Sequence, residues 1–301
     1  MDRHLNGGVR FRVMGLLAIA CCVCLSSAAR GLNAEPQAVS SAIPCAGAEP
    51  QLRAAQQALD QGDIPGVERF LTPLQSSHPD CSQVLILSGQ ILAMKRQPVA
   101  ARKTLEKACK LDANNPEAHF QLGALFDSRQ LHPEAVEQFE RVVALRPRDA
   151  RAFDYLALNL ESLGETRKAE TAYQEGLQVN EGPLADTFLV YNYGRFLMKA
   201  NRLRESKVHL DRALRISPDT RAVYYEHGRL NLRLQKYNEA RMDAERALSL
   251  ADPSGYVLDL QVYYLLSTIY TRLGNTELAE KYAALCRTSR VPIQSQGRGG
   301  P

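Results

Sequence analysis

The chain has 301 residues, of which 45% are hydrophobic and 23% are charged, a composition that is typical of folded globular proteins and excludes the collagen-like and strongly disordered classes. Residues 1–34 contain four arginines and one aspartate, and removing them from the totals of 37 basic and 33 acidic residues leaves 33 and 32, a net charge of +1. This nearly neutral remainder gives no electrostatic reason to expect binding to nucleic acid or to an anionic membrane surface.

Residues 1–34 have the features of a secretory signal peptide. Three arginines precede an apolar run at residues 13–25, and four small residues follow at 26–29. We therefore expect the protein to be exported to the periplasm or the cell exterior, with this segment removed.

Two alternatives remain open for the same segment. The stretch 13–29 has 17 residues, close to the length needed to span about 30 Å of hydrocarbon, so it could be retained as a membrane anchor. The residues Ala18, Ile19, Ala20 and Cys21 are similar to a weak bacterial lipobox that lacks the usual leucine, so Cys21 could carry a lipid. No other part of the chain has an apolar run near 18 residues, and we expect no further membrane segment.

Residues 35–47 are rich in proline, alanine and serine without a helical period, and we expect them to form a flexible leader. After them begins a pattern with a period of about 34 residues. A small residue recurs in seven places: Ala55, Gly89, Gly123, Ala157, Gly194, Gly228 and Ser267. A second column follows 12 residues later: Val67, Ala101, Ala135, Ala169, Ser206, Ala240 and Ala279. A third column lies four residues further: Leu71, Leu105, Phe139, Tyr173, Leu210, Ala244 and Ala283.

These three columns divide the chain into seven windows. Residues four apart lie on one face of a helix, so the second and third columns predict one helix and the first column predicts another. Each window is therefore expected to form two helices joined by a tight turn. The windows are residues 48–81, 82–115, 116–149, 150–183, 187–220, 221–254 and 260–293, with inserts at 184–186 and 255–259. Residues 294–301 are expected to be a disordered tail.

The third window carries the clearest signature. Its marked residues are Leu122, Gly123, Phe126, Ala135, Phe139 and Pro147. This order of Leu-Gly, an aromatic, Ala, an aromatic and a final Pro resembles the tetratricopeptide repeat, although His119 stands where the family usually has Trp. The resemblance implies an all-α fold: a right-handed superhelical solenoid of about seven helical hairpins, in which the first helices line a concave groove.

No catalytic or cofactor-binding motif is present in the sequence. Nothing matches HExxH, GxSxG, GxGxxG or the phosphate-binding GxxxxGK[ST] pattern, and the histidines after residue 34 form no i, i+4 pair. The windows fill residues 48–293 and leave no stretch in this sequence that is long enough for a catalytic domain. We therefore predict a non-catalytic protein without a cofactor or a metal.

The family resemblance also implies which positions of each first helix face the groove: the second, fifth, ninth, twelfth and thirteenth. In the last three windows these positions carry aromatic and basic side chains: Tyr191, Arg195, Tyr225, Arg229, Arg233 and Tyr264. Tyrosine and arginine are enriched in interface hot spots, so we predict that this patch binds a protein or peptide, and the arginines favour an acidic or carboxyl-terminal segment. The alternative interpretation is a solvated helix face. The amino-terminal part of the same face carries Asp127, Asp154 and Glu161.

The function that we predict is a non-catalytic scaffold that holds its ligand in the concave groove, in the cell envelope or outside the cell. Two other functions remain open. One is an accessory subunit of an envelope enzyme or of a secretion or assembly complex. The other is a glycan-binding module, which only the aromatic side chains in the groove suggest.

Four cysteines lie outside the signal segment: Cys45, Cys81, Cys109 and Cys286. Their spacing contains no CxxC pair and predicts no zinc site, and an exported protein can keep disulfides. The first hairpin runs out and back, which brings its end near its start, so we predict a disulfide between Cys45 and Cys81. Cys109, at the end of the next hairpin, is a competing partner for Cys81.

Overall fold

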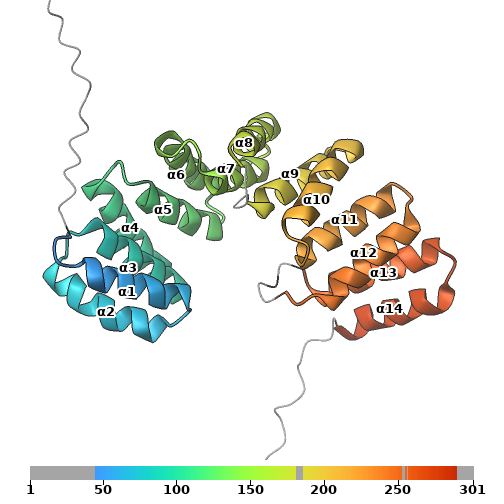
Figure 1. Ribbon diagram of the computed structural model, residues 1–301, viewed down its shortest axis with the longest axis horizontal. Helices are drawn as coiled ribbons and strands as arrows, with labels where there is room; N and C mark the ends of the chain where they lie inside the picture. The colour runs from blue at the N-terminus through green and yellow to red at the C-terminus, as the bar shows by residue number, and fades with distance from the viewer. Residues whose placement is uncertain (1–44, 181–185, 253–254, 256, 290–301) are drawn as a thin grey trace, which may run out of the picture. The chain divides into compact units, whose positions relative to one another are not determined.

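The computed structural model describes residues 45–180, 186–252, 255 and 257–289, all within one compact unit. Over these ranges the chain forms fourteen α-helices and no strand (Figure 1). The helices are α1 Glu49–Asp60, α2 Ile64–Ser77, α3 Ser82–Met94, α4 Pro98–Leu111, α5 Pro116–Ser128, α6 His132–Leu145, α7 Ala150–Ser162, α8 Thr166–Val179, α9 Thr187–Lys199, α10 Leu203–Ile216, α11 Arg221–Arg233, α12 Tyr237–Ser249, α13 Asp259–Arg272 and α14 Thr276–Ser289. The predicted signal segment, residues 35–44 of the leader and the predicted tail at 294–301 lie outside the described residues.

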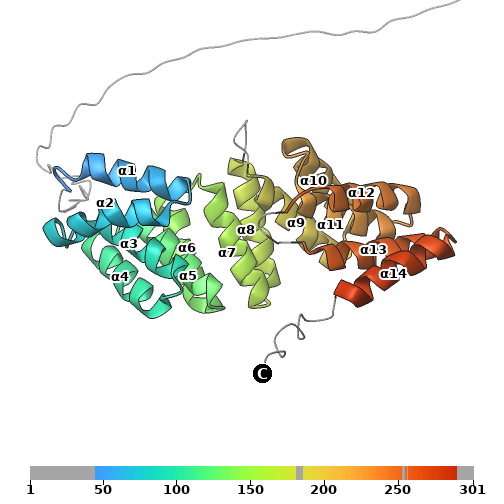
Figure 2. The same ribbon diagram turned by 90° about the horizontal axis from the view of Figure 1, so that it is seen from below.

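The helices form seven hairpins arranged in two layers. Each odd-numbered helix packs along the even-numbered helix that follows it, and the hairpins follow one another in chain order (Figure 2). Successive odd-numbered helices also contact one another, from α1 and α3 through to α11 and α13, whereas within the described residues no two even-numbered helices are in contact. The odd-numbered helices therefore form a continuous layer, which we call the first-helix face.

The turn inside each hairpin has the same backbone geometry in all seven cases. One residue adopts a left-handed conformation, with φ between 58° and 76°: Gly62, Arg96, Gln130, Gly164, Asn201, Gln235 and Gly274. The next residue then donates its N–H to a carbonyl five positions back, as Leu131 does to Phe126 at 2.9 Å. This is the Schellman arrangement, which satisfies the last carbonyls of the first helix and reverses the chain in a few residues.

The first column of small residues lies where the two helices of a hairpin cross. A Cβ atom added to Gly89 would lie 2.5 Å from Leu105 Cγ, and one added to Gly123 would lie 3.0 Å from the ring of Phe139. Leu105 and Phe139 belong to the third column, so a small residue on the first helix makes room for a large one on the second. Where the crossing contains a serine, its hydroxyl is satisfied: Ser206 Oγ donates to the carbonyl of Gly194 at 2.7 Å.

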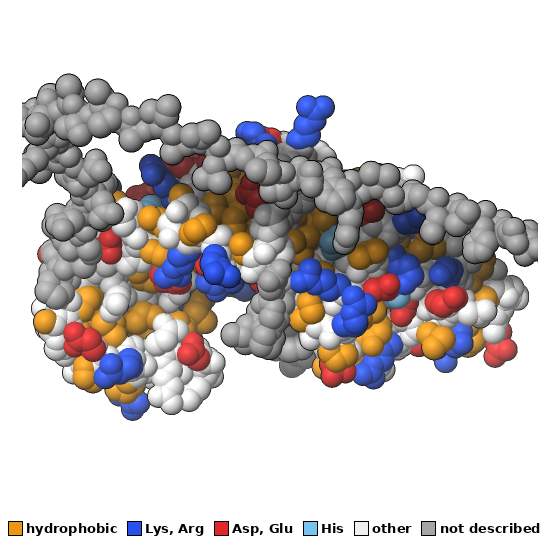
Figure 3. Space-filling view, turned by 45° about the horizontal axis from the view of Figure 1, so that its top comes forward, with side chains coloured by type: hydrophobic (Ala, Val, Ile, Leu, Met, Phe, Trp, Pro, Cys, Tyr) orange, Lys and Arg blue, Asp and Glu red, His pale blue; other side chains and the backbone are white. Residues whose placement is uncertain are grey.

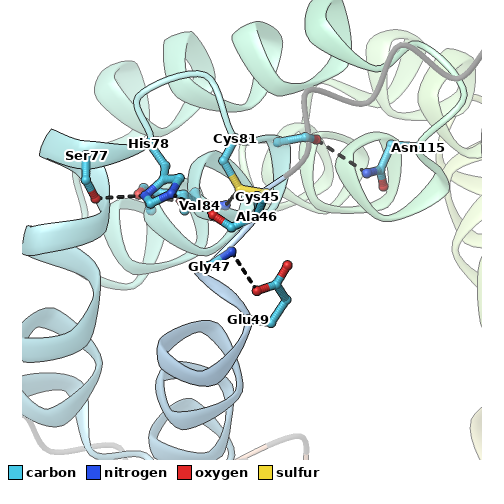
Figure 4. The surroundings of a disulfide bond; sticks show 11 residues. Cys45, Ala46, Gly47, Glu49, Ser77, His78, Cys81, Val84 and Asn115 are labelled. Carbon is cyan, nitrogen blue, oxygen red and sulfur yellow. Dashed lines mark hydrogen bonds between the residues drawn. A yellow bond between two sulfur atoms is a disulfide. The ribbon is translucent and has the colours of Figure 1, made fainter.

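A disulfide joins Cys45 to Cys81, with 5.4 Å between the two Cα atoms (Figure 4). Cys45 precedes α1 and Cys81 is the N-cap residue of α3, so the bond closes the first hairpin at its open end. Cys109 and Cys286 are free thiols, and burial raises the pKa of Cys109 to about 11, which keeps it protonated and unreactive at neutral pH.

Among the described residues, no helix combines the length and the apolar composition that crossing a bilayer requires.

Candidate functional site

A cavity of about 550 Å³ lies on the first-helix face, with walls from the first helices of five consecutive hairpins, α5 to α13. We call it the central cavity. Its walls include Asp154 from α7, Tyr191, Asn192 and Arg195 from α9, and Tyr225 and Glu226 from α11. Val257 and Gln261 complete the wall at the start of α13.

Helix geometry places these side chains together. Tyr191 and Arg195 are four residues apart, so they lie on one face of α9, and Asn192 is their neighbour on the side toward α7. Tyr225 and Glu226 follow Tyr191 and Asn192 by one repeat of 34 residues, so they occupy the same position on α11. The repeat thus places a tyrosine and a polar side chain in the cavity from each of two successive helices.

Asp154 and Asn192 form a buried hydrogen-bonded pair between α7 and α9. The side-chain amide nitrogen of Asn192 lies 3.0 Å from each carboxylate oxygen of Asp154, to which it donates. Asp154 is only 5% exposed, and burial raises the pKa of its carboxyl to about 7. A neutral amide compensates a buried carboxylate poorly, which is why the proton is held so strongly.

Arg195 is paired with an acidic residue of the preceding hairpin. One terminal nitrogen of its guanidinium lies 3.8 Å from Glu161, and Lys199 also approaches Glu161, with Nζ at 2.5 Å. The Nε atom of Arg195 is buried and has no hydrogen-bond partner among the described residues. The two basic side chains of α9 thus share one carboxylate.

Glu226 is held by Arg229 on the same helix. The guanidinium of Arg229 lies 2.8 Å from both carboxylate oxygens of Glu226, and the same group lies over the ring of Tyr225, 5.7 Å from its centre. Glu226 is buried, which raises its pKa, whereas the Arg229 side chain is 46% exposed. Glu226 therefore lies in the wall of the central cavity, whereas its partner Arg229 is partly in solvent and is not among the lining residues.

The structure brings together some of the six residues predicted for the patch and separates others. Tyr191, Arg195 and Tyr225 line the central cavity. Arg233 instead donates to the carbonyl of Met198 at 2.5 Å and to the side-chain oxygen of Asn201 at 2.8 Å, so it caps the end of α9. Tyr264 is 67% exposed and does not belong to the cavity wall.

The two arginines at the ninth helix position of the predicted patch are paired with acidic residues in the structure. Arg195 and Arg229 each already contact a carboxylate of the protein, Glu161 and Glu226 respectively. Figure 3 shows the same mixture at the surface, where basic and acidic side chains lie next to one another on the right-hand part of the view. Glu226 is absent from the predicted patch because it occupies the sixth helix position, which the family resemblance does not assign to the groove.

No arrangement suited to metal binding accompanies this site. In the described parts of the chain, no three histidine, cysteine, aspartate or glutamate side chains come close enough together to hold a metal ion.

Known protein families and sequences resemble this chain in its repeats. A sequence model described as tetratricopeptide repeat matches residues 99–150, and a second with the same description matches residues 222–253 and 260–286. The human protein O-mannosyl-transferase TMTC3 is 25% identical over 176 residues, which is 58% of this chain and 19% of that protein. The BBSome complex member bbs-4 of Caenorhabditis elegans is 27% identical over 108 residues, 36% of this chain and 23% of that protein. The chain thus spans about a fifth of the length of these relatives.

Solved structures resemble the chain over most of its length. The pilF protein of Pseudomonas aeruginosa superposes with a TM-score of 0.60 at 18% identity, covering 69% of this chain and 91% of that one. A tetratricopeptide repeat protein from Parabacteroides merdae gives a TM-score of 0.59 at 16% identity, covering 82% and 94%. At these identities the likeness shows a shared helical-repeat fold.

Proposed function

Because the chain is built of tetratricopeptide repeats, we propose that it is a non-catalytic scaffold that holds a segment of a partner protein in the central cavity. The observation that carries the proposal is the composition of the cavity wall. It combines the rings of Tyr191 and Tyr225 with the buried polar groups of Asp154 and Asn192 and the half-buried guanidinium of Arg195, drawn from successive hairpins. Large aromatic surfaces beside polar groups in a concave site are typical of interface hot spots.

Tyr225→Ala is expected to weaken peptide binding by tenfold or more, because truncating a hot-spot aromatic costs about 2 kcal/mol. The probe is a displayed library of random 12-residue peptides selected on the full chain, and affinities of the selected peptides are measured by calorimetry. Tyr264→Ala is the matched control, since it removes the same ring from an exposed position outside the cavity. It should change affinity less than twofold.

Unfolding curves for both variants establish that each is folded before its affinity is compared. If Tyr225→Ala binds every selected peptide as well as the parent does, the central cavity is not the binding site, and the layer of even-numbered helices should be searched. If Tyr264→Ala weakens binding equally, the ligand covers the whole patch predicted from the sequence.

We also propose that the protein acts in the periplasm or outside the cell after removal of residues 1–34. The basic start, apolar run and small residues of this segment support export. The disulfide between Cys45 and Cys81 supports it independently, because such bonds persist in oxidising compartments. Amino-terminal sequencing of the native protein tests this: a mature start near residue 35 is expected, whereas an intact Met1 in membranes would favour the anchor and an acylated Cys21 the lipoprotein.

The ligand favoured by the sequence is an acidic or carboxyl-terminal segment, which Arg195 and Arg229 would hold. The acidic ligand remains a prediction, and the charge of the peptides selected from the library tests it. An accessory role in an envelope complex is compatible with the same scaffold, and a stoichiometric enzyme that co-purifies with the chain would identify it.

A further inference from the structure

The walls of the central cavity contain more acidic than basic side chains. Four carboxylates line it, from Asp127, Asp154, Asp186 and Glu226, against two guanidiniums, from Arg151 and Arg195. A cavity with this balance attracts a cation more strongly than an anion.

Both guanidiniums already have partners within the protein. Arg195 pairs with Glu161, and Arg151 lies over the ring of Phe120, 3.9 Å from its centre. Of the carboxylates, Asp186 caps α9 by accepting from the backbone N–H of Phe188 at 2.7 Å. These contacts reduce what Arg151, Arg195 and Asp186 can offer to a ligand.

Asp154 and Glu226 are in a different situation, because both are buried in the cavity wall. Asp154 has only the neutral amide of Asn192 as a hydrogen-bond partner among the described residues. Among the described residues, Glu226 has Arg229 as its hydrogen-bond partner, and the Arg229 side chain is 46% exposed to solvent. Burial raises the pKa of both carboxyls, so the nearby arginines and lysine do not fully offset the loss of solvent around these two groups.

Aromatic rings stand beside these carboxylates. Phe188 is 44% exposed and lies edge-on to Tyr191, with 6.4 Å between the ring centres, and Tyr225 lies one helix further on. Carboxylates next to aromatic faces form the usual environment for a basic side chain, whose stem packs on the rings and whose charge is attracted to their π faces.

We propose that the central cavity binds a lysine or arginine side chain from the partner segment, with its charged group against Asp154 and Glu226 and its stem along Tyr191 and Phe188. The proposal rests on the function proposed above and names the chemistry of the ligand. It predicts a basic ligand side chain, whereas the sequence alone favours an acidic segment.

The test uses the same random-peptide selection on the full chain. Selected peptides are expected to share one basic residue, and replacing it by citrulline or norleucine should weaken binding at least tenfold. Asp154→Asn, which keeps the shape of the side chain and removes its charge, should weaken binding of these peptides fivefold or more. The matched control is Asp219→Asn, which removes an exposed carboxylate paired with Arg246 outside the cavity and should leave affinity within twofold.

A second readout separates ligand contact from a structural role. The affinity of the parent for a lysine peptide should rise between pH 6 and pH 8, as Asp154 with its pKa of about 7 becomes ionised while lysine stays charged. Glu226, Asp127, Asp186, Glu161, Arg151 and Arg195 also face this region. The decisive comparison is therefore with Asp154→Asn, in which the pH dependence should shrink to the part that Glu226 contributes.

Three outcomes would overturn the proposal. Selected peptides could share an acidic residue and bind Asp154→Asn more tightly, which would favour the acidic segment instead. Basic peptides could bind Asp154→Asn as tightly as the control Asp219→Asn, which would place the bound cation away from Asp154. Both outcomes leave the scaffold function intact, whereas the absence of any peptide sensitive to Tyr225→Ala would overturn that function as well.

Discussion

Ala135→Arg is expected to lower the free energy of unfolding by about 3 kcal/mol or more, because it places a charged side chain where two helices cross. Ala135 lies on α6, is fully buried and belongs to the same apolar cluster as Phe120 and Phe139. Gly123→Leu acts at the same crossing from α5, since its Cβ would already press on the Phe139 ring, and should cost about 2 kcal/mol.

Denaturant unfolding followed by circular dichroism measures both changes. Glu137→Arg is the matched control, because it introduces the same charged group at an exposed position two residues away on the same helix. It should change stability by less than about 0.5 kcal/mol. An unfolding curve for Ala135→Arg that overlays the parent would show that the hairpins do not cross at this column.

Asp154→Asn is expected to stabilise the protein at pH 8 by up to about 4 kcal/mol. Burial in the native state raises the pKa of this carboxyl from 3.8 to about 7. Each unit of pKa difference between the native and unfolded states corresponds to about 1.4 kcal/mol, by which ionisation at high pH destabilises the fold. Asparagine resembles the protonated, neutral form and avoids that penalty, although it can lose part of the hydrogen bonding to Asn192.

The sign of the pH dependence follows from proton binding. Between about pH 4 and pH 7 the native state holds a proton on Asp154 that the unfolded chain has released, so the stability of the parent falls as the pH rises through this window. Asp154→Asn lacks this proton, and its advantage should be absent near pH 4 and complete near pH 8. A stability difference that does not vary with pH would show that Asp154 titrates normally in the native state.

The fold could be predicted from the sequence because the helix crossings constrain residue size in every repeat. Only a small residue fits opposite Leu105 or Phe139. The first column, which contains Gly89 and Gly123, therefore recurs with a period of about 34 residues that is visible in the sequence. Backbone geometry at the turn adds a second constraint, since the chain must reverse through one left-handed residue.

The site could be predicted only in part, because side-chain pairing across helices has no periodic signature. Tyr191, Arg195 and Tyr225 line the central cavity, and their role in binding stays a prediction. Arg233 occupies the same helix position as Lys199 in the previous window, yet it reaches back to the end of α9 rather than to the cavity. Whether a side chain turns toward a ligand or toward a neighbouring carbonyl depends on distances that the sequence does not contain.

The seven hairpin turns also differ in how well their residues suit them. Three turns have glycine at the left-handed position, Gly62, Gly164 and Gly274, and glycine adopts this conformation without steric cost. Three others have Arg96, Gln130 and Gln235 there, and their Cβ atoms crowd the backbone, at a free-energy cost of roughly 1 kcal/mol each. These three side chains are exposed and lie outside the central cavity. Replacing these three residues by glycine should therefore make the protein more stable without changing the central cavity.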